Sequence, residues 1–262
     1  MSDLTSPAPD HREDEYYSGC LYEKKNFWRF RPAKTYLSRV SISDEDIRRI
    51  RELAAKGTIV YAIKQRSKLN SLIIDEIAGR TGLPQPVYCH GMNMSFWQPL
   101  SKMLKFYGSS FLRRFRKDQV TRRGKLDFLE RKVANHESIV IHLGESEFIE
   151  SRSAEDALES LINVQRRVSF PVFIVPLLVA YGRRREKEDE SLINILFGQM
   201  EHTGTLRRLI TFIRYSHQAF VIPTEPVNLT DYLSANKRSS PDDLIRDLRG
   251  ELIEHIEEEK AA

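Results

Sequence analysis

Short apolar runs alternate with helical patterns along most of this chain, and this alternation restricts the fold more than any other feature. The strand-like runs lie at 58–63, 87–90, 138–143, 172–180 and 219–223. Between them, apolar residues recur at helical spacing near 43–56, 67–80, 125–135 and 154–167. Strands separated by helix-length segments are typical of a parallel sheet whose faces are covered by helices. We therefore predict an α/β fold with a mixed, largely parallel sheet flanked by helices.

The size and composition of the chain are those of a protein with one substantial core. It has 262 residues, of which 40% are hydrophobic and 30% are charged, and such a length favours one main domain. Cys20 and Cys89 stand far apart and outside any Cys-x-x-Cys pair, so the sequence indicates neither a disulfide framework nor a zinc site. This use of cysteine favours a reducing, cytoplasmic compartment.

Apolar stretches in the chain are too short to cross a bilayer as a helix. The run at 170–180 contains two prolines and has about half of the roughly 20 residues that a spanning helix needs. The N-terminus is polar and acidic, unlike a secretion signal. We therefore expect any contact with a membrane to be peripheral.

We expect three segments along the chain. Residues 1–40 form a disordered tail followed by an aromatic and basic arm, which either packs on the core or lies at a membrane interface. Residues 41–238 form the α/β domain. Residues 239–262 form an amphipathic helix, whose apolar stripe suits docking on its own domain or on another one.

Positive charge is clustered, although the net charge is only +4. One basic group covers 113–117 and continues at 122–125, and a second covers 183–185. Such groups attract phosphate, anionic lipid or nucleic acid, or form a solvated surface. Because the sequence has neither an RNP-like strand nor a clear helix-turn-helix, we expect no nucleic-acid partner.

A polar turn follows the first strand and leads directly into a helix. The stretch from Gly57 to Ile74 places Gln65 and Asn70 where a strand–turn–helix frame can present catalytic groups. Carboxamide side chains cannot take up a proton near neutral pH. Neither side chain can therefore act as a general base in this turn.

Four segments of the chain resemble, in order, the sequence blocks of the glycerolipid acyltransferases. In block I of that family a strand delivers a His-x4-Asp motif, and Gln65 and Asn70 occupy those two positions here. Gly108–Arg114 matches block II, and the apolar, proline-containing strand Phe173–Tyr181 matches block IV. Block III should contain Glu-Gly-x-Arg, but Ile141–Glu147 lacks the arginine. The structural blocks are matched, whereas the chemical blocks are altered.

The resemblance covers about residues 47–237 and points to the large, membrane-associated bacterial glycerol-3-phosphate 1-O-acyltransferases, whose N-terminal region carries a degenerate acyltransferase-like domain. It implies that Arg113 and Arg114 bind a substrate phosphate, and that neither a cofactor nor a metal takes part. The implied partners are glycerol 3-phosphate, acyl-CoA or acyl-carrier protein, a catalytic acyltransferase domain or chain, and the anionic inner face of the cell membrane.

Three functional hypotheses follow from these patterns. The first is a non-catalytic acyltransferase-like domain of the glycerol-3-phosphate acyltransferase system in phospholipid biosynthesis, which supports binding of a membrane, a substrate or a partner domain. The second is an active glycerol-3-phosphate or lysophospholipid O-acyltransferase with non-standard catalytic residues. The third is an anionic-lipid or protein-binding module with no ancestral substrate role.

Two histidines are the remaining candidates for proton transfer. His90 and His142 stand near predicted strand ends, where the sites of α/β proteins gather. His142 could act as a base beside Glu145 or Glu147, although a single histidine next to a strand is more often structural.

Other enzyme signatures are missing from the sequence. Asp75 and Glu76 follow Asn70 on the same predicted helix, and we expect them to face solvent or a neighbouring basic group. The sequence has no Gly-x-Ser-x-Gly elbow. It also has no glycine pattern of a nucleotide-binding loop.

Overall fold

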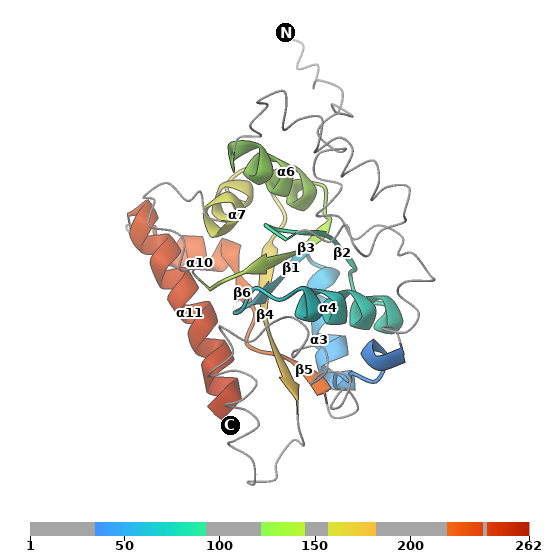
Figure 1. Ribbon diagram of the computed structural model, residues 1–262. Helices are drawn as coiled ribbons and strands as arrows, with labels where there is room; N and C mark the ends of the chain where they lie inside the picture. Colours follow the sequence, from blue (N-terminus) through green and yellow to red (C-terminus); the bar gives the residue numbers. More distant parts are fainter. Residues whose placement is uncertain (1–34, 93–121, 145–156, 182–218, 238–239, 262) are drawn as a thin grey trace, which may run out of the picture.

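The computed structural model of the protein describes residues 35–92, 122–144, 157–181, 219–237 and 240–261 (Figure 1). Several predictions made from the sequence concern residues outside these ranges. They include those for the first 34 residues, Arg113, Arg114, Glu145, Glu147 and the basic group at 183–185.

Within the described residues, the sheet has six strands in the order β2-β3-β1-β4-β5, and β6 also pairs with β4. The strands are β1 (Thr58–Ile63), β2 (Pro86–Cys89), β3 (Ser138–His142), β4 (Val172–Tyr181), β5 (Ala219–Pro223) and β6 (Val227–Asn228). The first four are mutually parallel where they pair, and β5 and β6 run antiparallel to β4. The prediction of an α/β fold with a mixed, largely parallel sheet is confirmed.

Helices cover both faces of this sheet (Figure 1). They are α3 (Asp44–Ala54), α4 (Lys68–Thr81), α6 (Arg122–Ala134), α7 (Ala157–Gln165), α10 (Leu229–Ala235) and α11 (Pro241–Ala261). Apolar residues of α3 and α4 share one core cluster, and those of α6, α7, α10 and α11 share the other. Among the helices of the described ranges, none combines the length and the apolar character that crossing a membrane requires.

The central strand β1 supplies both cores, because its successive side chains point to opposite faces. Ile59, Tyr61 and Ile63 lie in the cluster with α3 and α4. Val60 and Ala62 lie in the other cluster. All six residues of β1 are buried, which explains why the strand reads as a continuous apolar run.

Pro176 lies inside the paired strand β4, where it faces Ala62 of β1 in register. A proline cannot donate a hydrogen bond to the sheet, so the side to which its nitrogen points matters. The Pro176 carbonyl accepts a hydrogen bond from the backbone N–H of Thr224, at 3.0 Å. In an extended strand the N–H and C=O of one residue point the same way, so the missing donor faces the bend between β5 and β6. The proline therefore removes no bond between β1 and β4.

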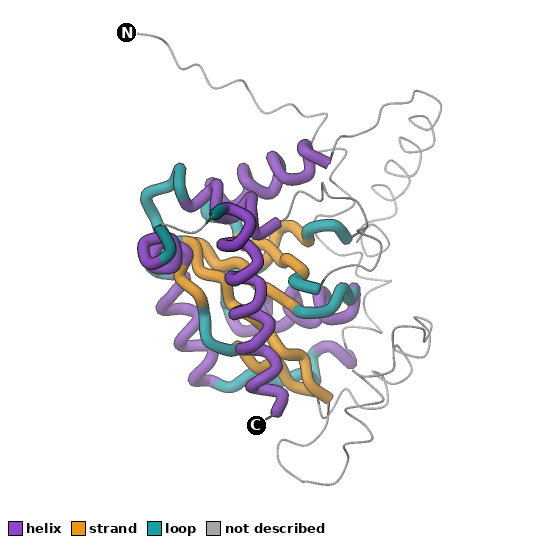
Figure 2. Tube along the Cα trace, turned by 90° about the vertical axis from the view of Figure 1, so that its left-hand side faces the viewer, coloured by secondary structure: helices purple, strands orange, loops and turns teal. Residues whose placement is uncertain are grey.

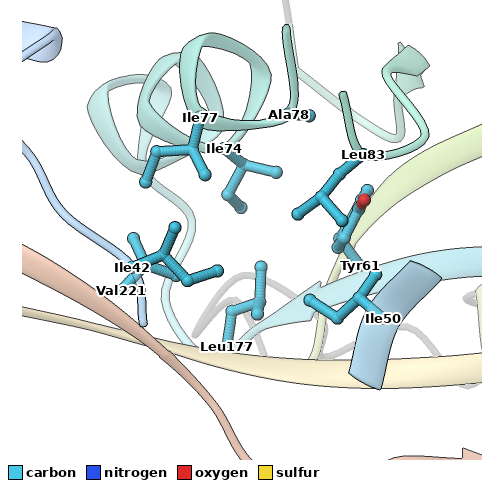
Figure 3. A pocket seen from close by; sticks show the side chains of 9 residues that line it. All are labelled: Ile42, Ile50, Tyr61, Ile74, Ile77, Ala78, Leu83, Leu177 and Val221. Carbon is cyan, nitrogen blue, oxygen red and sulfur yellow. The ribbon is translucent and has the colours of Figure 1, made fainter. Parts of the chain in front are cut away.

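A small apolar space lies between α3, α4 and the sheet (Figure 3). Its volume is only about 10 Å³, and its lining consists of Ile42, Ile50, Tyr61, Ile74, Ile77, Ala78, Leu83, Leu177 and Val221. The Tyr61 hydroxyl donates to the Pro84 carbonyl at 2.9 Å, and burial raises the pKa of this hydroxyl. A buried water needs two to four polar partners, so this space is an imperfection in packing rather than a ligand site.

The long helix α11 lies across the strands on the second face of the sheet (Figure 2). Its buried residues are Leu244, Leu248, Leu252 and Ile256. They recur every four residues and form one stripe, which packs into the core cluster of α6, α7 and α10. Leu248 and Leu252 are completely buried, so α11 is an integral part of the core.

Replacement of Leu248 by alanine should lower the free energy of unfolding by about 2–5 kcal/mol, because it removes buried methyl groups and leaves a cavity. Chemical denaturation monitored by circular dichroism measures this change. Glu254→Ala is the matched control, since Glu254 lies on the exposed side of the same helix. Equal stability of the two variants would show that α11 does not pack on the sheet in solution.

Candidate functional site

The parallel strands β2, β3 and β1 end side by side at the carboxyl edge of the sheet. Ile63 and His142 are partners in register. Beyond the strands, the N–H groups of Leu143 and Gly144 donate to the carbonyls of Ile63 and Lys64, at 2.9 and 2.8 Å. Ligands of open α/β sheets bind at this edge, and His142, His90 and Gln65 lie at or just after the ends of these strands.

Gln65 and Asn70 lie on either side of the start of α4. Ser67 is the N-cap of this helix, and its hydroxyl accepts a hydrogen bond from the backbone N–H of Asn70, at 3.3 Å. Asn70 is therefore fixed on the first turn, while Gln65 lies in the preceding loop. Both residues line one cavity of about 80 Å³. The structure thus brings the two carboxamides to a shared cavity.

Helix α11 borders this cavity from the opposite side. Ile256, Glu257 and Lys260 contribute to the lining. The ammonium group of Lys64 lies 2.7 Å from a carboxylate oxygen of Glu257. A hydrogen bond from Lys64 keeps the pKa of Glu257 below its usual range, and burial opposes this effect. Both side chains are about 40% exposed (41% and 42%), so the pair positions α11 more than it stabilises the fold.

A second contact fixes α11 to the end of β3. The guanidinium group of Arg249 donates to the carbonyl of Leu143, at 2.6 Å. Gly144 follows directly, and a Cβ atom there would lie 2.6 Å from the carbonyl oxygen of Lys64. Only a glycine allows the chain after β3 to pass this close to the end of β1. At Gly144 the close backbone contact between the ends of β3 and β1 therefore leaves no room for a side chain.

His142 is held by the loop after β2. Its Nδ1 atom lies 3.2 Å from the carbonyl oxygen of His90. A carbonyl only accepts hydrogen bonds, so Nδ1 must carry the proton, and the neutral ring presents Nε2 as an acceptor. The Nε2 atom is buried and meets no hydrogen-bond donor among the described residues. Such an unsatisfied buried acceptor costs about 1–3 kcal/mol.

The surroundings of His142 keep the imidazole ring neutral. The pKa of His142 is lowered to about 4, mainly by burial and also by the nearby positive charge of Arg66 and by the neighbouring His90. The hydrogen bond to the His90 carbonyl acts against these effects. At neutral pH the edge therefore contains a fixed, uncharged histidine beside an arginine.

Arg66 is exposed at this edge and makes no ion pair within the part of the chain that the structure describes. It lies against Gly91, since a Cβ atom built on that glycine would be 3.0 Å from the Arg66 Nη2 atom. Gly91 has a positive φ of 69°, a conformation that glycine adopts without strain. Apart from its position next to Gln65, nothing in the sequence singles out Arg66.

The burial of Asp75 and Glu76 differs from what the sequence suggested. Both were expected to face solvent or a basic group, but they are only 4% and 8% exposed. Ser71 to Ala78 are all buried in α4, so this helix is covered on all sides rather than on one stripe. A helix with a single apolar face would have left both carboxylates in water, and the expectation of solvent exposure was wrong.

The expected phosphate contacts cannot be placed relative to this edge. Arg113 and Arg114, the expected phosphate contacts, lie outside the described residues. Within the described ranges, no group of three His, Cys, Asp or Glu side chains gathers as metal ligands would.

Comparison with known proteins identifies related sequences. The model of one protein family, described as "Glycerol-3-phosphate acyltransferase PlsB N-terminal domain", matches residues 30–260. The chain is 28% identical over 202 residues to a glycerol-3-phosphate acyltransferase of Haemophilus influenzae (strain PittEE), which covers 74% of this chain and 25% of that protein.

Proteins of the same name from two other organisms give similar matches. The identity is 26% over 202 residues for Histophilus somni (strain 129Pt), with 74% of this chain and 24% of that protein covered. It is 28% over 198 residues for Alteromonas mediterranea, with 72% and 24% covered. The chain thus spans about a quarter of the length of these relatives.

The titration of His142 tests the electrostatics of this edge. We expect a pKa near 4, which an Arg66→Gln variant should raise because it removes a nearby positive charge. The unfolded chain then binds the proton first, so the free energy of unfolding should fall as pH drops from about 6.5 to about 4. Nuclear magnetic resonance of the histidine rings measures the pKa. A value near 6.5 for His142 would contradict the geometry.

Proposed function

The chain belongs to the family of glycerol-3-phosphate acyltransferase PlsB N-terminal domains, and we propose that it is a non-catalytic acyltransferase-like domain that supports a catalytic acyltransferase in phospholipid biosynthesis. The observation that carries this proposal is the pair of carboxamides, Gln65 and Asn70, at one cavity on the carboxyl edge of the sheet. In the active acyltransferases that this chain resembles, a histidine and an aspartate occupy these two positions.

Carboxamides cannot replace the histidine and the aspartate chemically. Acyl transfer to a hydroxyl needs a group that removes the hydroxyl proton while the thioester is attacked. Neither Gln65 nor Asn70 takes up a proton near neutral pH. The loss of general base assistance alone removes about 10²- to 10⁴-fold in rate. Neither side chain at these two positions of the cavity could therefore remove the proton of an acceptor hydroxyl.

His142 supports the alternative of an active enzyme by its geometry but not by its basicity. Its Nδ1 atom is oriented by the His90 carbonyl, and its Nε2 atom is uncharged. An efficient general base has a pKa near the working pH. Because the pKa of His142 is lowered to about 4, the ring is a poor proton acceptor at neutral pH. This observation favours the non-catalytic proposal.

The proposed role is to support and position other components. The relatives named above are about four times as long as their match to this chain, and we propose that a catalytic acyltransferase domain or chain acts beside this one. Glycerol 3-phosphate and acyl-CoA or acyl-carrier protein would then be substrates of the assembly. The basic group at 113–117 would place the domain at the anionic inner face of the cell membrane.

The purified chain should not transfer an acyl group from acyl-CoA or acyl-carrier protein to glycerol 3-phosphate above the rate of the protein-free reaction. A radiochemical assay of the lipid product measures this, with an active acyltransferase as the positive control. A Gln65→Ala, Asn70→Ala double variant should give the same result. Turnover that disappears in this variant or in His142→Ala would overturn the proposal.

Membrane attachment should depend on charge. We expect the chain to float with vesicles that contain phosphatidylglycerol but not with purely zwitterionic vesicles, and the bound fraction should fall as salt is added. Replacement of Arg113, Arg114, Arg116 and Lys117 by glutamine should reduce binding. A bound fraction that does not change with salt concentration, or no binding at all, would contradict the proposed membrane role.

A further inference from the structure

We propose that Arg66 and His142 form a binding site for a phosphate group that carries a proton, at the carboxyl edge of the sheet. Neither of these two described residues lines the cavity of Gln65 and Asn70. The proposed site is therefore separate from that cavity.

The first argument is the hydrogen bond that His142 lacks. Nδ1 is committed as a donor to the His90 carbonyl, and Nε2 is a buried acceptor without a donor in the described part of the chain. Buried polar atoms in folded proteins are nearly always hydrogen-bonded. A ligand that completes this site must therefore supply a hydrogen atom to Nε2.

The second argument is the charge of Arg66. Its guanidinium group is exposed, close enough to His142 to influence the ring, and without an ion pair within the described ranges. Guanidinium groups bind phosphate and carboxylate oxygens through two parallel hydrogen bonds. The absence of a side chain on Gly91 allows Arg66 to lie against the loop after β2. The ligand must therefore be an anion.

The ligand must carry a negative charge for Arg66 and donate a hydrogen bond to His142, and few chemical classes do both. A carboxylate or a sulfate is an anion but has no hydrogen atom to donate at neutral pH. A simple polyol can donate but has no charge for Arg66. A phosphate monoester has its second pKa near 6, so around this pH it is an anion with one P–OH group. Such a group can accept from Arg66 and donate to His142.

Two sources could supply this group, namely a free phosphate ester or the headgroup of phosphatidic acid in a membrane. This inference rests on the proposed function, but different experimental results would contradict the two proposals. Acyl transfer that depends on His142 would contradict the non-catalytic role while leaving phosphate binding intact. An inactive protein that binds no phosphate would contradict only the inference made here.

The test is a titration of the full chain, labelled with ¹⁵N in histidine, with inorganic phosphate at pH 6. His142 should remain mostly neutral at this pH because its pKa is near 4. We expect the Nε2 resonance to move as phosphate is added. Sulfate at the same ionic strength should bind at least about tenfold more weakly, because it cannot donate the hydrogen bond.

Variants separate a specific site from general attraction of anions. Arg66→Gln should weaken phosphate binding by about tenfold or more, since it removes the charged hydrogen bonds. Arg48→Gln is the matched control, because Arg48 is an exposed arginine of α3 that makes no side-chain hydrogen bond or ion pair within the described residues. This control should bind phosphate as the parent does.

A second experiment uses only the parent chain, so it does not depend on how well the variants fold. It also identifies the source of the phosphate group. Vesicles with phosphatidic acid, compared with vesicles of phosphatidylglycerol, are added to the parent chain. A shift of His142 with inorganic phosphate supports a free ester, and a shift only with phosphatidic acid supports a lipid headgroup. Equal binding of sulfate and phosphate, an equal effect of Arg48→Gln and Arg66→Gln, or no shift with any of these probes would overturn the inference.

Discussion

The register between β1 and its two parallel neighbours is the constraint on which the candidate site depends. Ile63, His142 and Leu177 stand at the same level, because β1 pairs with β3 on one side and with β4 on the other. A slip of one residue would turn every side chain of β1 to the opposite face. The two different apolar clusters on the two faces oppose such a slip, so packing fixes where the strands end.

The level at which the strands end decides which polar groups meet. The backbone bond from Gly144 to the Lys64 carbonyl continues the β1–β3 pairing past both strands. It places the loop with Gln65 and Arg66 beside the end of β3. Lys64, meanwhile, turns toward Glu257 on α11. One edge therefore combines two carboxamides, the positive charge of Arg66 and a neutral histidine.

Much of the local structure could be predicted from the sequence. The strands 58–63 and 219–223 have the expected bounds, and Ser67 caps α4 where the polar turn indicated a helix start. These features depend on side-chain periodicity and on capping, which act over a few residues. The contact of Lys64 with Glu257 could not be predicted, because 193 positions separate the two residues and no local pattern connects them. The burial of Asp75 and Glu76 also depends on what packs around α4.

By itself, the sequence determined the α/β class and the order of most elements, because both follow from residue type and spacing. The family resemblance added the expectation that the carboxamides Gln65 and Asn70 stand at the positions of a proton-transfer pair. Only the tertiary structure decided that these carboxamides share a cavity bordered by α11, and that His142 is held neutral between His90 and Arg66. The physical reason is that the pKa and the unsatisfied hydrogen bond of a side chain depend on burial and on charges brought together from distant parts of the chain.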